Sequence, residues 1–217
     1  MFPQKEVVTL YDAVTPVAVT SSTDATPIVV TASSHGYTNG QRVLIYGHTT
    51  NIAANGIFKV YGVTTNTFKL QDEITGADIA GSGAGAGSSG VVVTAPPIIH
   101  LSDFRNIIIQ VGTSGTATTT LKIAGSIGKT PLSSSGARGS MPNFGATVAP
   151  SNPYTFLQAI NLDTAAAVNG ATGLVASGAD INNQYEVNVN GQVFLTVFPA
   201  TWTQGAITVK ALMVTNA

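Results

Sequence analysis

The sequence predicts an all-β fold built from antiparallel strands. Apolar and polar residues alternate with period two along most of the chain, the pattern of half-buried strands. Asn-Gly pairs, suited to tight turns, occur at 39–40, 55–56, 169–170 and 190–191. The best helical candidate is the short 163–168, which Gly170 would end. Strands and turns therefore account for nearly all of the chain.

The predicted strands follow one another at short intervals. In 27–32, Ile28, Val30 and Ala32 share one face, and in 57–62 Phe58 and Val60 do the same. Alternation or β-branched composition then predicts strands at 67–71, 91–95, 98–101, 106–111, 118–124, 155–160, 185–189, 193–198 and 206–214. We expect the predicted strands 185–189 and 193–198 to form a hairpin around Asn190-Gly191.

The charge content is unusually low. Only 9% of the residues are charged, against about 25% in a typical soluble domain, and the net charge is −1. No basic face is available for nucleic acid. A surface covered by Thr, Ser, Asn, Gly and Ala is weakly protected against association. The composition is therefore typical of a protein that works inside an assembly.

Several classes of chemistry and location are not expected. The chain has no cysteine, so disulfides, thiolate metal sites and cysteine nucleophiles are excluded. Lys5 and Glu6 stand where a signal peptide would need apolar residues, and no segment approaches the roughly 18 apolar residues of a membrane helix. We expect synthesis and folding in the cytoplasm and no contact with a membrane.

Two segments are rich in small residues. Residues 76–90 are a linker or long loop. Residues 128–153 are rich in Pro, Gly and Ser and are long for a loop within a compact domain. This second segment is either an extended arm that becomes ordered against a neighbouring subunit or a solvent-exposed loop.

Two glycine-rich motifs do not predict phosphate binding. "GAGSSG" at 85–90 matches G-x-G-x-x-G, but an Ala/Gly run precedes it and a strand-like segment follows it. "GSIGKTP" at 125–131 has Ile123 where a P-loop needs its first glycine, and Pro131 where its helix begins. The adjacent carboxylates of Asp72 and Glu73 would point to opposite faces of a strand.

The segment 31–50 holds two histidines, which could indicate a metal or catalytic site. His35 and His48 could approach each other, but zinc needs two further ligands, and a catalytic base needs an orienting carboxylate. No acid lies between Asp24 and Asp72. A connection between strands explains more of these residues, with Gly36 and Asn39-Gly40 forming turns. We therefore assign no catalytic, cofactor-binding or metal residue, and expect no cofactor.

Residues 27–70 resemble a small β-barrel module of tailed-phage structural proteins, the FCCH-like module. The resemblance rests on "HGYTNGQRVLIYG" and on "NGIFKVYGVTTNTFKL". It implies no catalytic residue. Residues 104–127 and 185–214 are similar to small phage virion proteins, in which a closing hairpin packs a β-sandwich. This similarity implies that Trp202 is a packing anchor in a turn.

The resemblances complete the predicted architecture, a small β-barrel module plus an antiparallel, jelly-roll-like β-sandwich. Residues 1–20 form an N-terminal arm or edge strand of the sandwich. Residues 21–95 form the barrel with its Gly/Ala-rich linker, and 96–217 form the sandwich with the arm at 128–153. A barrel of this size has a meagre core and needs support from another domain or subunit.

The resemblance and the composition predict a non-enzymatic structural protein of a phage virion. The favoured role is a decoration, or cement, protein on the capsid surface that binds the major capsid protein as a homo-oligomer, with a trimer as the expected form. The alternative is a tail fibre, baseplate or adaptor component whose barrel binds a host-surface glycan, with Tyr37, Tyr46 and Tyr61 supplying the rings. A glycosidase would need a pair of carboxylates that the spacing does not suggest.

Overall fold

The computed structural model describes residues 5–73, 75–83, 90–97, 99–101, 104–126, 154–170, 172–179, 181–189 and 191–215. Over these residues the fold is all-β and antiparallel, as predicted, with one three-residue 3-10 turn, η1 (Ile52–Ala54). The described parts of 1–15 and 96–217 form one compact unit, the sandwich unit, and those of 16–95 form another, the barrel unit. The predicted arm at 128–153 lies outside the described residues.

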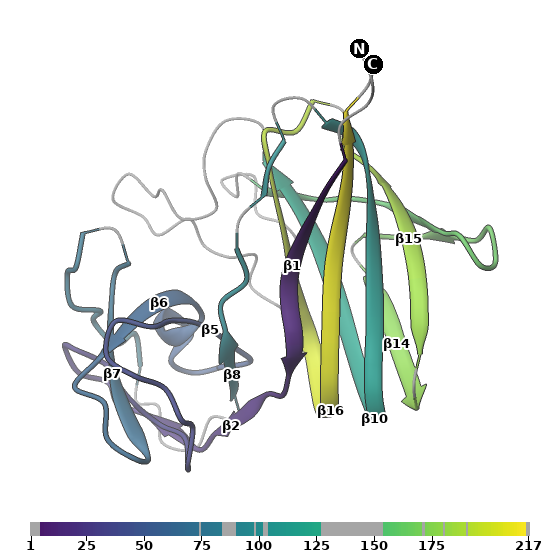
Figure 1. The fold of residues 1–217 in the computed structure, drawn as a ribbon. Coiled ribbons are helices and arrows are strands. Elements are labelled where there is room, and N and C mark those ends of the chain that lie inside the picture. Colours follow the sequence, from purple (N-terminus) through teal and green to yellow (C-terminus); the bar gives the residue numbers. More distant parts are fainter. Residues whose placement is uncertain are drawn as a thin grey trace. The chain divides into compact units, whose positions relative to one another are not determined.

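The sandwich unit contains one nine-stranded sheet. Its strands are β1 (Lys5–Val14), β9 (Ile99–His100), β10 (Phe104–Ser126), β11 (Tyr154–Phe156), β12 (Ala159–Asn161), β13 (Ala167–Val168), β14 (Leu174–Ala179), β15 (Asn182–Asn188) and β16 (Phe194–Thr215). The main strand order is β1-β16-β10-β15-β12-β13, and Figure 1 shows β1, β16, β10 and β15 side by side. Strand β1 is hydrogen-bonded to β16 at one end of this order.

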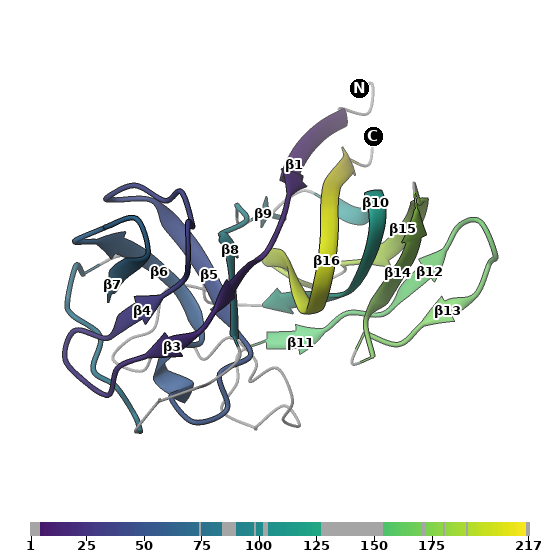
Figure 2. The same cartoon turned by 90° about the horizontal axis from the view of Figure 1, so that it is seen from below.

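Two long strands carry the sheet around the core. Strands β10 and β16 pair from Phe104↔Thr215 to Ser126↔Phe194, and the register shifts between Ser114 and Thr118. Gly115 and Gly205 lie in this region with φ of +67° and +78°. The half with the start of β10 and the end of β16 pairs with β1 and β15. The half with the end of β10 and the start of β16 pairs with β9, β11 and β14. The faces of the sandwich thus belong to one curled sheet, whose bend is visible along β16 in Figure 2.

Three local expectations about these strands are wrong. The predicted strands 106–111 and 118–124 are parts of β10, and 193–198 and 206–214 are parts of β16. The closing hairpin around Trp202 is therefore one bent strand. The hairpin expected at Asn190-Gly191 also fails, because β10 lies between β15 and β16 in the ladder. Period-two alternation identifies a strand, but it does not identify which strand pairs with it.

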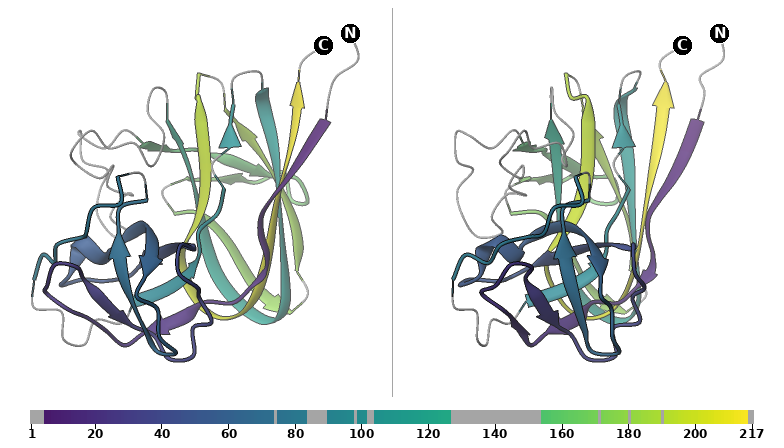
Figure 3. Two further views of the ribbon diagram at one scale, coloured as in Figure 1. Left: turned by 60° about the vertical axis from the view of Figure 1, so that its left-hand side comes forward. Right: turned by 90° about the vertical axis from the view of Figure 1, so that its left-hand side faces the viewer.

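The barrel unit contains a seven-stranded sheet that closes on itself. Its strands are β2 (Val17–Val19), β3 (Ser21–Ser22), β4 (Val29–Thr31), β5 (Arg42–Tyr46), β6 (Gly56–Tyr61), β7 (Thr67–Gln71) and β8 (Gly90–Thr94). The order is β2-β8-β5-β6-β7-β4-β3. Because β2 and β3 are consecutive in the chain, the segment 17–22 supplies both ends of the order and pairs with β8 and with β4. The two views of Figure 3 show this unit with its short strands around a central core.

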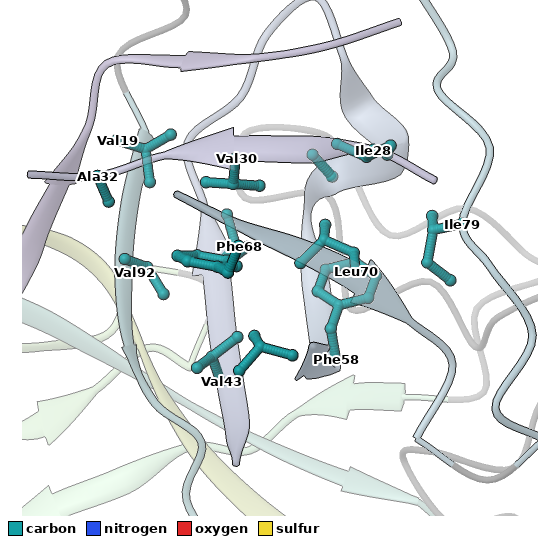
Figure 4. Close-up of a cluster of buried hydrophobic side chains, with 13 residues drawn as sticks. Val19, Ile28, Val30, Ala32, Val43, Phe58, Phe68, Leu70, Ile79 and Val92 are labelled. Atoms are coloured by element: carbon teal, nitrogen blue, oxygen red, sulfur yellow. The ribbon is translucent and has the colours of Figure 1, made fainter. Parts of the chain in front are cut away.

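The barrel has its own continuous apolar core. Phe58 and Phe68 lie at its centre and are fully buried, and Figure 4 shows side chains from several strands converging on them. The buried residues of this cluster are Val19, Ile28, Val30, Ala32, Val43, Ile45, Ala54, Phe58, Val60, Phe68, Leu70, Ile79 and Val92. The alternation read from the sequence is therefore confirmed for Ile28, Val30, Ala32, Phe58 and Val60.

Candidate interaction surface

An apolar row crosses the outward face of the sandwich sheet at one level of the strands. Partner registers connect its members in sequence across six strands, so their side chains lie on the same face. The row consists of Val7, Leu212, Ile108, Glu186, Ile160 and Ala167. Five of these six residues are apolar, and Val7 and Ile160 are 62% and 47% exposed.

The neighbours of each row member point the other way, into the core. Ile107 and Ile109 flank Ile108 on β10 and are fully buried. On β16, Ala211 and Met213 flank Leu212 and are buried as well. The row is therefore an outward apolar surface and not a part of the core. A sequence signal could have identified this row. At Ile107–Ile109 and again at Ala211–Met213, three apolar residues follow one another where a half-buried strand would alternate apolar and polar residues.

Mostly polar residues flank the apolar row on both sides. One neighbouring level carries Lys5, Val214, Asn106 and Asn188, and the other carries Thr9, Lys210, Gln110 and Gln184. The Asn106 amide Nδ2 donates to Glu186 Oε1 at 2.8 Å, and the Gln110 amide donates to Asn182 Oδ1 at 2.8 Å. An apolar centre with a polar rim is the usual anatomy of a protein–protein contact.

The hairpin of β12 and β13 extends this surface at one end. The Asn161 carboxamide oxygen accepts hydrogen bonds from the backbone N–H groups of Asp163 and Thr164, at 2.8 and 3.1 Å. Asn161 N also donates to Ala166 O at 2.9 Å. These bonds order the turn, and Leu162, just beyond the row, is 43% exposed. Figure 1 shows the hairpin projecting beyond β15.

The structure places His35 in a turn of the barrel unit, as the strand-connection interpretation predicts. Tyr37 N donates to His35 Nδ1 at 3.0 Å. The imidazole stacks on the Tyr37 ring, with a centroid distance of 5.2 Å, and meets the edge of Phe68 at 5.0 Å. Gly36 and Gly40 have φ of +70° and +88°, which glycine adopts readily. The residues of this turn serve the packing of the barrel.

His48 lies on a different part of the barrel unit and is buried. Its backbone N–H and C=O are both bonded to the Asn55 side chain, at 2.9 and 2.8 Å. Burial lowers the pKa of the imidazole. Within the described residues no group of three or more His, Cys, Asp or Glu side chains is arranged to hold a metal ion.

The adjacent acids Asp72 and Glu73 serve separate structural contacts. Asp72 follows β7 and accepts from the backbone N–H and hydroxyl of Thr75 at 2.9 and 3.1 Å. Glu73 forms an ion pair with Arg42, with 2.5 Å between Nε and Oε2. The two carboxylates therefore have different partners.

The three tyrosines named for glycan binding differ in exposure. Tyr46 is buried, and burial raises its pKa. Tyr37 is half-buried against His35 and Phe68. Tyr61 is half-buried, donates a hydrogen bond to the Asp78 carboxylate, and has the Lys69 ammonium 5.8 Å from its ring centroid. The Tyr61 ring thus has a carboxylate and an ammonium group beside it.

Trp202 is a packing anchor, as predicted. The indole is buried, its Nε1–H donates to Gly205 O at 3.0 Å, and its ring meets the Tyr11 ring edge-on at 6.4 Å. The Tyr11 hydroxyl in turn donates to Val197 O at 3.1 Å. These contacts tie β1 to both sides of the bend in β16.

The two glycine-rich motifs fall mainly outside the described residues. Of "GAGSSG" only Gly90 is described, where it begins β8, and "GSIGKTP" is described only as far as Ser126 in β10. The one helical turn within the described ranges has three residues, and no described helix is long and apolar enough to cross a bilayer.

No family model matches the sequence, and no curated protein matches it. Among solved structures, the SPBc2 prophage-derived protein YomS is 11% identical and has a TM-score of 0.40, over 99% of this chain and 96% of that one. The PBSX exported protein XepA is 9% identical and has a TM-score of 0.36, over 99% of this chain and 82% of that one.

Proposed function

We propose that this chain is a non-enzymatic structural protein of a phage virion, and specifically a decoration protein that binds the capsid shell as a homo-oligomer. The observation that supports this proposal best is the apolar row on the outward face of the sandwich sheet. A sheet face that water covers on one side normally alternates polar residues outward. Here apolar side chains occupy the same outward level on β1, β16, β10 and β12.

Covering this row would stabilise a contact. Burial of apolar surface contributes roughly 25 cal/mol per Å², or about 1.5–3 kcal/mol for a fully buried Val, Leu or Ile side chain. Part of that is offset by the loss of translational and rotational freedom on association. In a homo-oligomer such a contact holds the copies together, and the oligomer then presents several capsid-binding surfaces to the shell at once. A shell of identical subunits is a regular lattice that can engage them together.

The low charge fits the same role. With 9% charged residues, the chain has little long-range electrostatic attraction for a partner. Recognition then depends on shape and on apolar contact at short range. We therefore expect binding to the major capsid protein to change little with salt concentration.

The test is co-sedimentation of the purified chain with undecorated capsids of the phage that encodes it, followed by imaging at lattice resolution. Stoichiometric density at symmetry-related shell positions is the expected result. Absence from the shell, with density at the tail instead, would contradict the decoration role. Repeating the sedimentation at 0.05 and 0.5 M salt checks the electrostatic expectation.

Tyr61 favours a second candidate function, a tail component whose barrel unit binds a host-surface glycan. An aromatic face beside a carboxylate and an ammonium can stack on a sugar ring and bond its hydroxyl groups, and the Tyr61, Asp78 and Lys69 group offers these elements. A glycan array, with Tyr61→Ala as the binding-deficient variant and Tyr37→Ala as its control, tests this function. Equal binding by wild type and Tyr61→Ala would reject the Tyr61 site.

A further inference from the structure

From the arrangement of the outward face we infer that the apolar row is the contact between two copies of this chain, packed face to face about a twofold axis that runs along β10. The inference rests on the homo-oligomer part of the proposed function and names its surface. Three observations support it: the positions of the row members relative to β10, the opposite charges of Glu186 and Lys210, and the extent of the outward face.

Val7 on β1 and Ile160 on β12 each stand two strands away from β10, on opposite sides of it. Strands β16 and β1 lie on one side of β10, and β15 and β12 lie on the other. Consider a twofold axis that runs parallel to β10, midway between the two sheets. Each residue then faces a residue of the second copy at the same height along the strands, but on the opposite side of β10. Ile108 then meets its own counterpart, and Val7 at one end meets Ile160 of the second copy at the other. The two exposed large apolar members of the row thus cover each other, twice in each dimer.

The two charged side chains nearest the centre also match under this axis. Glu186 is on β15 within the row, and Lys210 is on β16 at the adjacent level. The axis places Lys210 of one copy over Gln184 of the other, one residue pair or about 7 Å along the strand from Glu186. A lysine side chain spans that distance. Each dimer therefore gains two Lys210–Glu186 pairs between copies.

Glu186 keeps its internal partner in this arrangement. Its Oε1 accepts from Asn106 within the same copy at 2.8 Å, and a carboxylate has further acceptor positions for an ammonium group. Its aliphatic stem would lie over Leu212 of the second copy, which stands on β16 at the same level. The one acidic member of the row is thereby accommodated, whereas a wholly apolar partner surface would leave it without an opposite charge.

The extent of the face suits a specific contact. Five strands at about 4.8 Å spacing make a surface roughly 24 Å wide. Three levels of outward side chains take part along each strand. Sheets that pack face to face in this way lie about 10 Å apart. Three levels about 7 Å apart add roughly 20 Å along the strands, so the footprint is on the order of 500 Å² per partner, at the lower limit for a specific interface. A twofold contact of this kind cannot itself close the trimer expected from the sequence.

The first test measures self-association of the full chain by sedimentation equilibrium over a concentration series. Wild type should form dimers, and Ile108→Glu, which places two like charges on the axis, should weaken the dimer at least about 100-fold. Val175→Glu is the matched control, because Val175 is 60% exposed on β14, away from the row. Equal association of all three proteins, or a monomeric wild type, would overturn the inference. Far-ultraviolet circular dichroism confirms that each variant is folded.

The second test exchanges the charges. Glu186→Lys and Lys210→Glu should each weaken the dimer about 10-fold or more, and the double variant should restore it, since each copy then again offers opposite charges. A double variant no better than either single one would contradict the proposed axis. Capsid co-sedimentation of Ile108→Glu separates the two proposals: monomers that still decorate the shell support the function without the dimer. A wild type that dimerises but never binds capsids supports the dimer alone.

Discussion

The two units of this chain differ in whether their sheet closes: the sheet of the barrel unit closes on itself, and the sheet of the sandwich unit stays open. The barrel unit closes its seven strands through the segment 17–22, so no long strand edge is left open, and its apolar residues gather in one internal cluster. The sandwich unit curls one sheet around a core but keeps the ten-residue β1 at the end of its strand order and apolar residues on its outward face. Closure abolishes sheet edges, whereas an open sheet must manage them.

This difference leads us to expect that the two units contribute differently to association. Apart from the polar group around Tyr61 and the exposed Ile52, the side chains described in the barrel unit serve its own packing. His35 packs in a turn, and Phe58 and Phe68 lie at the centre of the core. In the sandwich unit, the inward-facing residues of each strand fill the core, and the outward face carries further apolar residues. Association is therefore expected to depend on the sandwich unit, and the predictions below break or sharpen that division.

The largest expected effect is on the barrel core. Phe68→Ala should reduce the free energy of unfolding by about 3–5 kcal/mol, because a fully buried ring is removed and a cavity remains. Ile108→Ala, on the outward face, should cost less than about 1 kcal/mol in the isolated chain. Urea unfolding of both variants checks this difference. Similar losses at a protein concentration where the chain is monomeric would show that Ile108 is covered within a single copy.

The next effect concerns the bend of the curled sheet. Gly205 has a φ of +78°, and a Cβ there would lie 2.7 Å from Ala117 Cα. Gly191 has the same φ of +78° but nothing within 4 Å of such a Cβ. Gly191→Ala should therefore cost only the backbone strain, about 1–2 kcal/mol, and Gly205→Ala should cost several kcal/mol.

Thermal unfolding of both glycine variants makes this comparison, since the backbone strain is common to them. Equal shifts in melting temperature would mean that the bend tolerates a methyl group, and that the close approach of β10 and β16 is not required.

A smaller effect is expected at a buried amide in the barrel unit. Asn51 is fully buried; its Nδ2 donates to Ser22 Oγ and Thr23 O at 3.1 and 3.0 Å, and its Oδ1 accepts from Ser82 N at 3.0 Å. Asn51→Ala leaves these groups unpaired and should cost about 2–3 kcal/mol. Hydrogen exchange should show faster exchange of the Ser82 amide. Asn161→Ala, at an exposed turn of the sandwich unit, is the control and should cost about 1 kcal/mol or less.

The smallest effect is a pH dependence of the barrel unit. Burial lowers the pKa of His48 below its unfolded value of about 6.5. Below that pH the unfolded chain takes up a proton that the folded chain resists, so the free energy of unfolding falls as the pH falls, and it is constant above about 6.5. His48→Gln should remove this component. Urea midpoints from pH 8 to 5 measure it, and parallel curves for wild type and variant would assign the dependence elsewhere.

Individual residues show how far sequence reasoning reached. The alternation at 27–32 and 57–62 correctly predicted the inward Ile28, Val30 and Phe58, because a half-buried strand encodes its faces locally. The turn interpretation of His35 was correct for the same reason. The long strands β10 and β16 were each predicted as two, since Thr-rich and glycine-containing segments such as 113–117 have no clear alternation.

The sequence by itself determined that this protein is all-β, where most of its strands lie, and that His35 stands in a connection between strands. Those features depend on periodicity, turn-forming pairs and composition, all of which are local. Only the tertiary structure decided that β10 separates β15 from β16, and that Val7, Ile108, Ile160 and Leu212 stand at one level of one face. Strand order and register bring together residues that are far apart in the chain, and no local pattern contains that information.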